Sequence, residues 1–184
     1  MKTLQEIYEA RTTPDGYGDK GTAHSYIPVY ERLLSPMRDR VKAVLEIGVG
    51  PSALSLRMWS EYFEHAQIVG VDPDPVREPL PPRVQVFCED AYTANTAVKL
   101  AGYDYDLIVD DGSHLLAHQL MAVRLYRALL APEGILVIED VVDIGSVRPA
   151  FEAIGPCAIY DLRAAKGRYD DVLVVFGSVE RPRT

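Results

Sequence analysis

Short apolar runs and amphipathic segments alternate along most of the chain. The apolar runs are rich in Val and Ile and occupy residues 41–49, 67–71, 84–88, 105–109, 134–138, 157–160 and 172–176. Continuous runs of this length are typical of strands buried on both faces. Segments with helical spacing lie between the first five runs, at residues 53–63, 93–101 and 115–130. The last segment carries one apolar stripe, as expected for a helix packed on a sheet, made of Leu116, Leu120, Val123 and Leu130.

The order of these elements predicts an α/β fold. Alternating strands and helices form a doubly wound, mostly parallel sheet with right-handed crossovers. The last two runs are separated by the polar stretch RAAKGRYD, so we expect them to form a hairpin at the sheet edge. A chain of 184 residues is predicted to form one domain. Within it, residues 1–40 would form an N-terminal cap and residues 41–184 the cofactor-binding core.

Composition and charge narrow the kind of ligand. Hydrophobic residues make up 48% and charged residues 25% of the chain, as in soluble globular proteins. The formal net charge of −8 disfavours nucleic acid as a partner and favours a small-molecule substrate. There is no apolar run of membrane-spanning length, and the start MKTLQEIYEA lacks the pattern of a signal peptide, so we expect a cytoplasmic protein with no membrane partner. A homo-oligomer is compatible with the sequence.

The two cysteines, Cys88 and Cys157, lie in separate apolar stretches. Neither has a second Cys or His at the spacing of a zinc site. We therefore expect both to be reduced thiols in the core.

A glycine-rich loop follows the first predicted strand. The stretch VLEIGVGPSAL places Gly48, Gly50 and Ala53 at the spacing of a dinucleotide-binding loop, although glycines after a strand can also be plain turn residues. Glu46 near the strand end would be unfavourable beside a pyrophosphate but suits the cationic amino-acid end of S-adenosyl-L-methionine. Asp72 follows Gly50 by 22 residues, where an acid can accept ribose hydroxyls. Together these residues favour S-adenosyl-L-methionine over NAD.

Acidic residues end each of the first four predicted strands. Asp90, followed by Ala91, ends the third run in FCEDAY, and we expect these two residues at the adenine side of the cofactor. In such a sheet, ligands bind outside the carboxyl ends of the strands. Any one of the acids could be a helix cap, but together they predict one binding crevice.

Three acids on two neighbouring strands predict a metal site. Asp111 lies at the end of IVDD, and Glu139 and Asp140 end GILVIED, 28 residues later. Neighbouring strands lie about 4.8 Å apart, so these carboxylates can share one Mg²⁺. Alternatively, Asp111 and Asp140 cap the helices that follow. Burying three acids without a cation would be costly, which favours the metal.

Two further residues near Asp111 have predicted roles. Successive side chains of a strand point to opposite faces, so we assign Asp111 to the metal and Asp110 to the loop or the cofactor. His114 follows three positions later, and an imidazole there suits proton abstraction near neutral pH, so we expect it to be the catalytic base. His118 lacks the partners of a zinc site and is expected to form hydrogen bonds within its helix or with the loop.

The segment DKGTAHSYIPVYERLL precedes the first predicted strand and contains a short amphipathic helix at about residues 26–34. Two interpretations remain open. It either caps the sheet, or Lys20, His24 or Tyr26 closes over a ligand.

These motifs resemble the class I S-adenosylmethionine-dependent methyltransferases. The segments that carry the resemblance are DKGTAHSYIPVYERLL, VLEIGVG, VGVDPDP, FCEDAY, DLIVDDGSHLLAHQ and GILVIEDV. Within that class, the chain is similar to the metal-dependent macrolide-sugar O-methyltransferases of the mycinamicin and tylosin pathways and to cephalosporin hydroxylase-like proteins. The resemblance implies a seven-stranded sheet with an antiparallel C-terminal hairpin and S-adenosyl-L-methionine over the first four strands. It also implies Mg²⁺ held by residues matching Asp111, Glu139 and Asp140, and a base matching His114.

The expected function is therefore Mg²⁺-dependent O-methylation of a small polyhydroxylated acceptor, a sugar or a diol, in natural-product biosynthesis such as that of antibiotics. Two alternatives remain: a non-catalytic or hydroxylase-accessory protein that binds the cofactor, and an NAD-linked oxidoreductase.

Overall fold

Seven strands form one mixed sheet in a computed structural model that describes residues 1–10 and 18–177. Their order across the sheet is β3-β2-β1-β4-β5-β7-β6. The strands are β1 (Ala43–Ile47), β2 (Gln67–Asp72), β3 (Val84–Cys88), β4 (Tyr105–Asp110), β5 (Leu130–Ile138), β6 (Cys157–Asp161) and β7 (Val172–Gly177). The first five are parallel, and β7 runs antiparallel to both β5 and β6. The predicted fold class and the C-terminal hairpin are confirmed.

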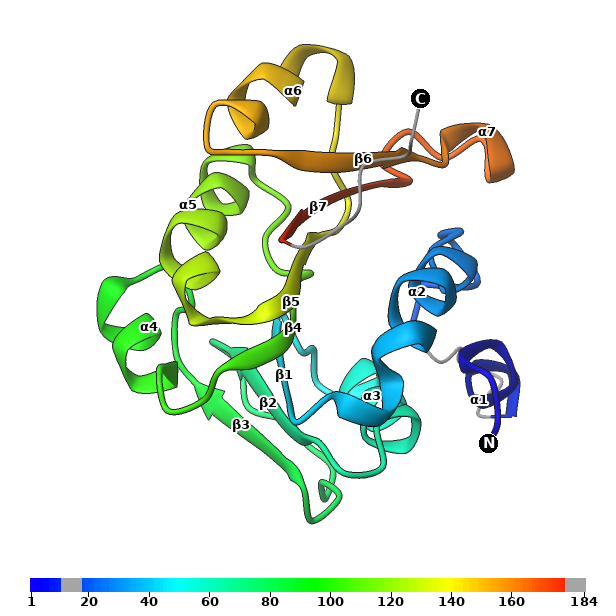
Figure 1. Cartoon of the computed structure of the whole chain (residues 1–184), viewed down its shortest axis with the longest axis vertical. Coiled ribbons are helices and arrows are strands. Elements are labelled where there is room, and N and C mark those ends of the chain that lie inside the picture. The colour runs from blue at the N-terminus through cyan, green and yellow to red at the C-terminus, as the bar shows by residue number, and fades with distance from the viewer. Residues whose placement is uncertain (11–17, 178–184) are drawn as a thin grey trace.

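Helices cover both faces of this sheet. They are α1 (Leu4–Ala10), α2 (Ile27–Leu34), α3 (Leu54–Tyr62), α4 (Ala94–Leu100), α5 (Leu116–Tyr126), α6 (Ile144–Glu152) and α7 (Arg163–Lys166), with 3₁₀ turns at Ser35–Arg40 and Arg127–Leu129. The first three lie on one side of the sheet, and α4, α5 and α6 lie on the other (Figure 1). The predicted N-terminal cap thus contributes two helices to one layer, although its residues 11–17 lie outside the described part of the chain.

Alternating side chains of each central strand enter two separate apolar layers. In β4, Leu107 and Val109 belong to the core cluster under α1, α2 and α3, whereas Ile108 belongs to the cluster under α4, α5 and α6. All three side chains are completely buried. Burial on both faces explains why these strands are continuous apolar runs in the sequence.

Some predicted boundaries are wrong. The helix expected over residues 115–130 ends at Tyr126, and β5 begins at Leu130 instead of residue 134. Leu130 pairs with Tyr105, and the register between β4 and β5 then shifts before Leu107. The start of β5 is therefore irregular. It contains Pro132 and Gly134, two residue types that are typical of loops, and this is why the sequence predicted a loop at residues 130–134. The polar stretch in the hairpin contains α7, and α6 was not predicted.

The expectation for Cys88 is also wrong, because this side chain is exposed. Its Sγ donates to the carbonyl oxygen of Pro73 at 3.1 Å. Since β3 is an edge strand, one of its faces is less covered than those of the central strands. Cys157 is partly buried, and both thiols are free.

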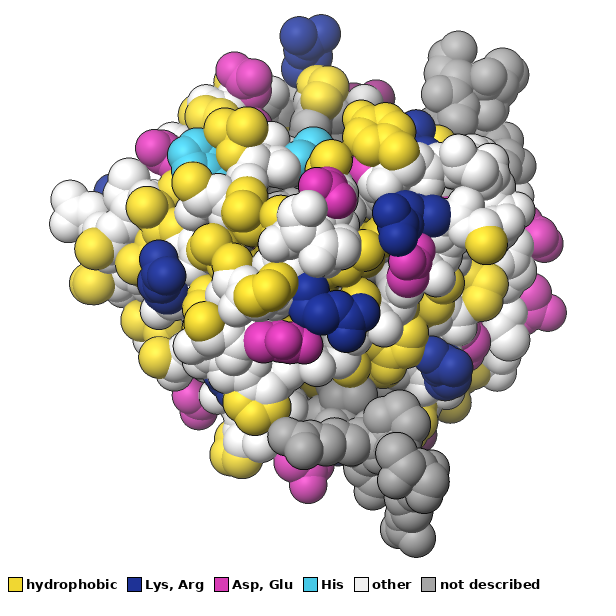
Figure 2. Space-filling view, turned by 90° about the horizontal axis from the view of Figure 1, so that it is seen from above, with side chains coloured by type: hydrophobic (Ala, Val, Ile, Leu, Met, Phe, Trp, Pro, Cys, Tyr) yellow, Lys and Arg dark blue, Asp and Glu magenta, His cyan; other side chains and the backbone are white. Residues whose placement is uncertain are grey.

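The surface carries charges of both signs. On the face shown in Figure 2, Lys and Arg side chains lie close to Asp and Glu side chains, with apolar side chains between them. Across the described residues, every helix is too short or too polar to cross a lipid bilayer.

Candidate functional site

A cavity of about 640 Å³ opens at the carboxyl ends of β1, β2 and β4. Several predicted site residues line it, namely Gly48, Gly50, Asp72, Asp90, Ala91 and Asp111. Ile7 and Tyr8 of α1 and residues 18–20 contribute a further wall. The structure thus brings most of the predicted cofactor residues into the single crevice expected from the strand ends.

The glycine loop lies directly against the end of β4. Gly48 has φ +82°, and a Cβ at this position would lie 2.1 Å from the carbonyl oxygen of Asp111. Gly50 also has positive φ but faces open space. Ala53 takes a left-handed conformation with φ 48° at the start of α3. Gly48 is therefore required for close packing of two loops, which a sequence motif alone does not reveal.

Asp72 fixes the shape of that loop. Its Oδ2 accepts hydrogen bonds from the backbone N–H groups of Val49 at 2.8 Å and Gly50 at 2.9 Å. Its Oδ1 accepts from the N–H of Asp74 at 2.8 Å. The side chain lines the cavity and is 9% exposed, so it combines a structural role with access to a ligand.

Glu46 lies in β1 and is completely buried. Its Oε2 accepts a hydrogen bond from Trp59 Nε1 at 2.9 Å, and its Oε1 is 3.4 Å from Lys20 Nζ. Burial raises the pKa of Glu46, while the positive charge of Lys20 lowers it. The residue is not among those that line the cavity.

Asp110, the last residue of β4, contacts Tyr92, whereas Asp111, which follows the strand, contacts Lys20, so the two carboxylates have separate partners, as expected from strand alternation. Asp110 is 2% exposed, and its Oδ1 accepts a hydrogen bond from Tyr92 Oη at 2.9 Å. The same hydroxyl accepts from the N–H of Ser113 at 3.1 Å, so Asp110 supports the loop through Tyr92. Burial raises the pKa of Asp110 to about 7.

An aromatic wall of the cavity escaped the sequence reasoning. The rings of Tyr92 and His118 stack with centroids 4.3 Å apart, and both line the cavity. His118 Nδ1 also shares a hydrogen bond with Ser113 Oγ at 2.8 Å, in line with its expected bond to the loop. Tyr92 directly follows the predicted pair Asp90–Ala91 in the sequence, which is the available signal for it.

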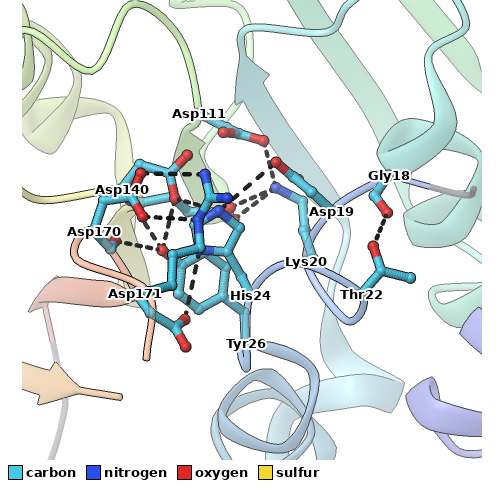
Figure 3. A network of polar contacts seen from close by, with 12 residues as sticks. Gly18, Asp19, Lys20, Thr22, His24, Tyr26, Asp111, Asp140, Asp170 and Asp171 are labelled. Carbon is cyan, nitrogen blue, oxygen red and sulfur yellow. Dashed lines mark hydrogen bonds and ion pairs between the residues drawn. The ribbon is translucent and has the colours of Figure 1, made fainter. Parts of the chain in front are cut away.

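A buried lysine holds three acids together. Lys20 Nζ donates to Asp111 Oδ2 at 2.6 Å and to both oxygens of Glu139 at 2.7 Å (Figure 3). Tyr30 also donates its hydroxyl to Glu139. Burial lowers the pKa of Lys20, but Asp111, Glu139 and Glu46 together raise it well above its ordinary value. Burial raises the pKa of Glu139, against the effect of Lys20.

Asp140 is the junction between this centre and the N-terminal segment. Its Oδ1 accepts a hydrogen bond from Tyr26 Oη at 2.7 Å and lies 3.2 Å from His24 Nε2 (Figure 3). Its Oδ2 lies 3.6 Å from Nε2 of His114. Burial raises the pKa of Asp140, an effect opposed by the Tyr26 hydrogen bond.

Of the three predicted metal ligands, two come together with the predicted base. One ligand atom each from Asp111, His114 and Asp140 lies within 4.8 Å of the others. His114 has φ 57°, and its side chain is 42% exposed. The carboxylate of Glu139 is instead directed at Lys20 and Tyr30. A role for Glu139 as a third ligand stays a prediction.

The N-terminal segment is part of this site. Lys20 lines the cavity, whereas His24 and Tyr26 are buried against Asp140. These residues precede α2, so no periodic pattern connects them to the ends of β4 and β5.

Comparison with known proteins identifies the family. A family model described as a methyltransferase domain matches residues 45–141. The 8-demethyl-8-alpha-L-rhamnosyl tetracenomycin-C 2'-O-methyltransferase of Streptomyces olivaceus is 37% identical over 142 residues, which cover 73% of this chain and 37% of that protein. Mycinamicin VI 2''-O-methyltransferase of Micromonospora griseorubida is 32% identical over 128 residues, or 65% of this chain and 32% of that protein. The chain thus spans 32–37% of the length of these two curated relatives.

A solved structure agrees with this family. It is described as the MycE methyltransferase of the mycinamycin biosynthetic pathway in complex with Mg and SAH. It superposes with a TM-score of 0.68 at 30% identity, over 82% of this chain and 40% of that one. The family match runs from within β1 to just past β5 and includes the strand ends that carry Asp72, Asp111 and Asp140, whereas the N-terminal part of the site lies outside it. The chain belongs to the methyltransferase-domain family and has the class I S-adenosylmethionine-dependent methyltransferase fold.

Proposed function

We propose that the chain is an S-adenosyl-L-methionine-dependent, Mg²⁺-dependent O-methyltransferase that acts on a hydroxyl of a small polyhydroxylated acceptor. The observation that carries this proposal is the position of Asp111, which lines the cavity and also lies within 4.8 Å of His114 and Asp140. A cofactor site and a centre for acid–base chemistry therefore meet at one residue. Relatives named as O-methyltransferases of rhamnosyl and mycinamicin compounds support a sugar hydroxyl as the acceptor.

The cavity fits the cofactor by its lining. The open space over Gly50 admits a ligand close to the backbone, and Asp72 and Asp90 offer carboxylates to ribose and adenine groups. The stacked rings of Tyr92 and His118 provide a flat surface beside them. Glu46 does not line the cavity, so we assign it an indirect role at the methionine end of the cofactor. It would hold Lys20, which does line the cavity, in place.

The acidic centre fits a divalent cation by its donors. Asp111 and Asp140 provide carboxylate oxygens, which Mg²⁺ prefers, and a third ligand is predicted from Glu139. When bound, Mg²⁺ would polarise an acceptor hydroxyl and lower its pKa. We keep His114 as the base because its ring is the most solvent-accessible group of the three that come together here.

In the proposed reaction, the acceptor oxygen attacks the sulfonium methyl group in line. The carbon–oxygen bond forms as the carbon–sulfur bond breaks, which releases S-adenosylhomocysteine. Nε2 of His114 takes the hydroxyl proton, with Asp140 Oδ2 3.6 Å away to stabilise the resulting imidazolium. The protein thereby supplies orientation and a proton acceptor.

The test is methyl transfer to a panel of rhamnosides and simple diols, followed by mass spectrometry. We expect a methylated product and equimolar S-adenosylhomocysteine with Mg²⁺, and neither with EDTA. Tight binding of S-adenosylhomocysteine without turnover on any acceptor would instead favour the non-catalytic alternative. Calorimetric titration with NAD serves as the control for the oxidoreductase alternative, and we expect no binding heat.

A further inference from the structure

Asp140 lies between two histidines, each accompanied by another aspartate. On the Oδ2 side is His114, which groups with Asp111. On the Oδ1 side is His24, which groups with Asp19. In both groups the ligand atoms lie within 4.8 Å of one another, and Asp140 belongs to both. The proposed function uses only the first group.

His24 is an unusual side chain for a protein interior. It is 0% exposed, and neither ring nitrogen has a hydrogen-bond partner among residues 1–10 and 18–177. Nε2 faces Asp140 Oδ1 at 3.2 Å and Asp19 Oδ2 at 3.8 Å, and Nδ1 faces Asp171 Oδ1 at 3.5 Å (Figure 3). A buried polar group without a hydrogen bond is costly, so a ligand between these atoms would stabilise the arrangement.

The spacing on the Nε2 side is close to that of a metal site. Ligand atoms about 2.1 Å from a common cation lie about 3.0 Å apart in octahedral geometry and about 3.4 Å apart in tetrahedral geometry. The distances of 3.2 Å from His24 to Asp140 and 3.8 Å from His24 to Asp19 need only a small adjustment. The side chain of Asp19 can move to shorten the longer of these distances, because it is 54% exposed.

The charges around His24 favour a cation. Lys20 is engaged by Asp111 and Glu139, and the guanidinium of Arg168 pairs with Asp170, with Nε 2.7 Å from Oδ1. Burial lowers the pKa of Arg168, but Asp170, and with it Asp140 and Asp19, raise it, so this one guanidinium is shared among several acids. Within the described ranges, the three acids facing His24, namely Asp19, Asp140 and Asp171, have no ion pair with Lys or Arg. Asp140 and Asp171 are buried, and one guanidinium shared with Asp170 leaves these carboxylates short of positive charge, which is disfavoured.

We propose that a second divalent cation binds to Asp19, His24 and Asp140, so that the Asp140 carboxylate bridges two ions. The inference rests on the proposed function for the first ion only. One imidazole among the ligands favours a first-row transition ion over Mg²⁺, and Mn²⁺, which also accepts carboxylate ligands, is the paramagnetic probe for it. The second ion would fix the segment from Asp19 to Tyr26 against the end of β5 and so hold Asp140 in position for the first.

The test is Mn²⁺ binding by the full chain after EDTA treatment, measured by electron paramagnetic resonance of free Mn²⁺. We expect two ions per wild-type chain and one for Asp19→Asn, which should fold as the wild type does because the Asp19 side chain is 54% exposed. Asp104→Asn, at an exposed position before β4, is the matched control and should still bind two. One ion per wild-type chain, or an Asp19→Asn variant that still binds two, would overturn the inference.

The same samples separate this inference from the proposed function. Methyl transfer by a wild-type chain that binds one Mn²⁺ would support the function and refute the second site. Two ions without methyl transfer to any acceptor would support the second site and count against the function.

Discussion

The ammonium group of Lys20 lies 2.7 Å from both carboxylate oxygens of Glu139, although the two residues are 119 positions apart in the chain. Their side chains are 4% and 1% exposed. Replacing Lys20 by Met leaves Glu139 and Glu46 buried without their cation. Because breaking a buried pair strands a charge, we expect the free energy of unfolding to fall by about 3–5 kcal/mol. Urea unfolding measures this change.

Lys99→Met is the control for that variant. Lys99 Nζ contacts Glu89 Oε1 at 2.5 Å, but this pair is on the surface, where water screens it. We expect its urea midpoint to stay close to that of the wild type. If the free energy of unfolding fell as much in Lys99→Met as in Lys20→Met, burial would not be the reason for the strength of the Lys20 contacts.

Removing the proposed base should affect turnover more than cofactor binding. For His114→Gln we expect kcat to fall by about 10²–10⁴-fold, because a positioned general base contributes about that much. The dissociation constant of S-adenosylhomocysteine should stay unchanged, since His114 is not among the residues that line the cavity. His65→Gln, at an exposed position before β2, is the control and should keep full turnover. Unchanged kcat in His114→Gln would remove the base assignment.

Gly48 should tolerate no side chain. Gly48→Ala would place Cβ 2.1 Å from the Asp111 carbonyl oxygen, so we expect a loss of about 1–3 kcal/mol in the free energy of unfolding from overpacking. It should also weaken the binding of S-adenosylhomocysteine, because the displaced loop lines the cavity. Gly167→Ala shares the positive φ, at +73°, but meets nothing within 4 Å. The difference between the two variants in calorimetry therefore isolates the contact from the backbone strain, and equal binding in both would contradict the prediction.

Asp110 should make stability depend on pH. Its pKa is raised from 3.8 to about 7 by burial, so the folded chain binds more protons than the unfolded chain between these values. The contribution of protonated Asp110 to the free energy of unfolding is fully present below pH 3.8 and is lost as the pH rises through about 7. At about 1.4 kcal/mol per pKa unit, the loss reaches up to about 4 kcal/mol.

Asp110→Asn removes this titration and keeps an oxygen that can accept from Tyr92. With EDTA present, we expect the variant to gain stability relative to the wild type between about pH 4 and about pH 8 in urea unfolding. Asp104→Asn, which is exposed, should show no such gain. A pH-independent difference between Asp110→Asn and wild type would contradict the assigned cause.

Much of the fold could be predicted because the central strands are buried on both faces. The runs around Leu45, Val69 and Ile108 are mostly apolar for this reason, and the polar stretch before β7 revealed the hairpin. Cys88 was misplaced because an edge strand has the same composition as a central one and differs only in its neighbours. Strand order is a property of the whole sheet.

The candidate site was predictable where it lies at strand ends, and less so elsewhere. Asp72, Asp90 and Asp111 reach the cavity because parallel strands end at one edge. The contact of Tyr30 with Glu139 depends on how α2 packs over the sheet, and in the sequence Tyr30 is simply one apolar position of an amphipathic helix. For Lys20 the sequence left a capping role and a ligand-closing role open, since charged residues in loops are usually solvated.

The position of Lys20 also bears on how the protein is made. A ribosome releases this lysine and Tyr30 well before Glu139 and Asp140, and the loop that carries Asp170 and Asp171 emerges later still. During synthesis the N-terminal segment therefore remains without its acidic partners until β5 and β7 have emerged and β5 has paired with β4 and β7. A nascent chain that ends before β5 would therefore carry the glycine-rich loop but would leave Lys20 and Tyr30 without the carboxylate of Glu139.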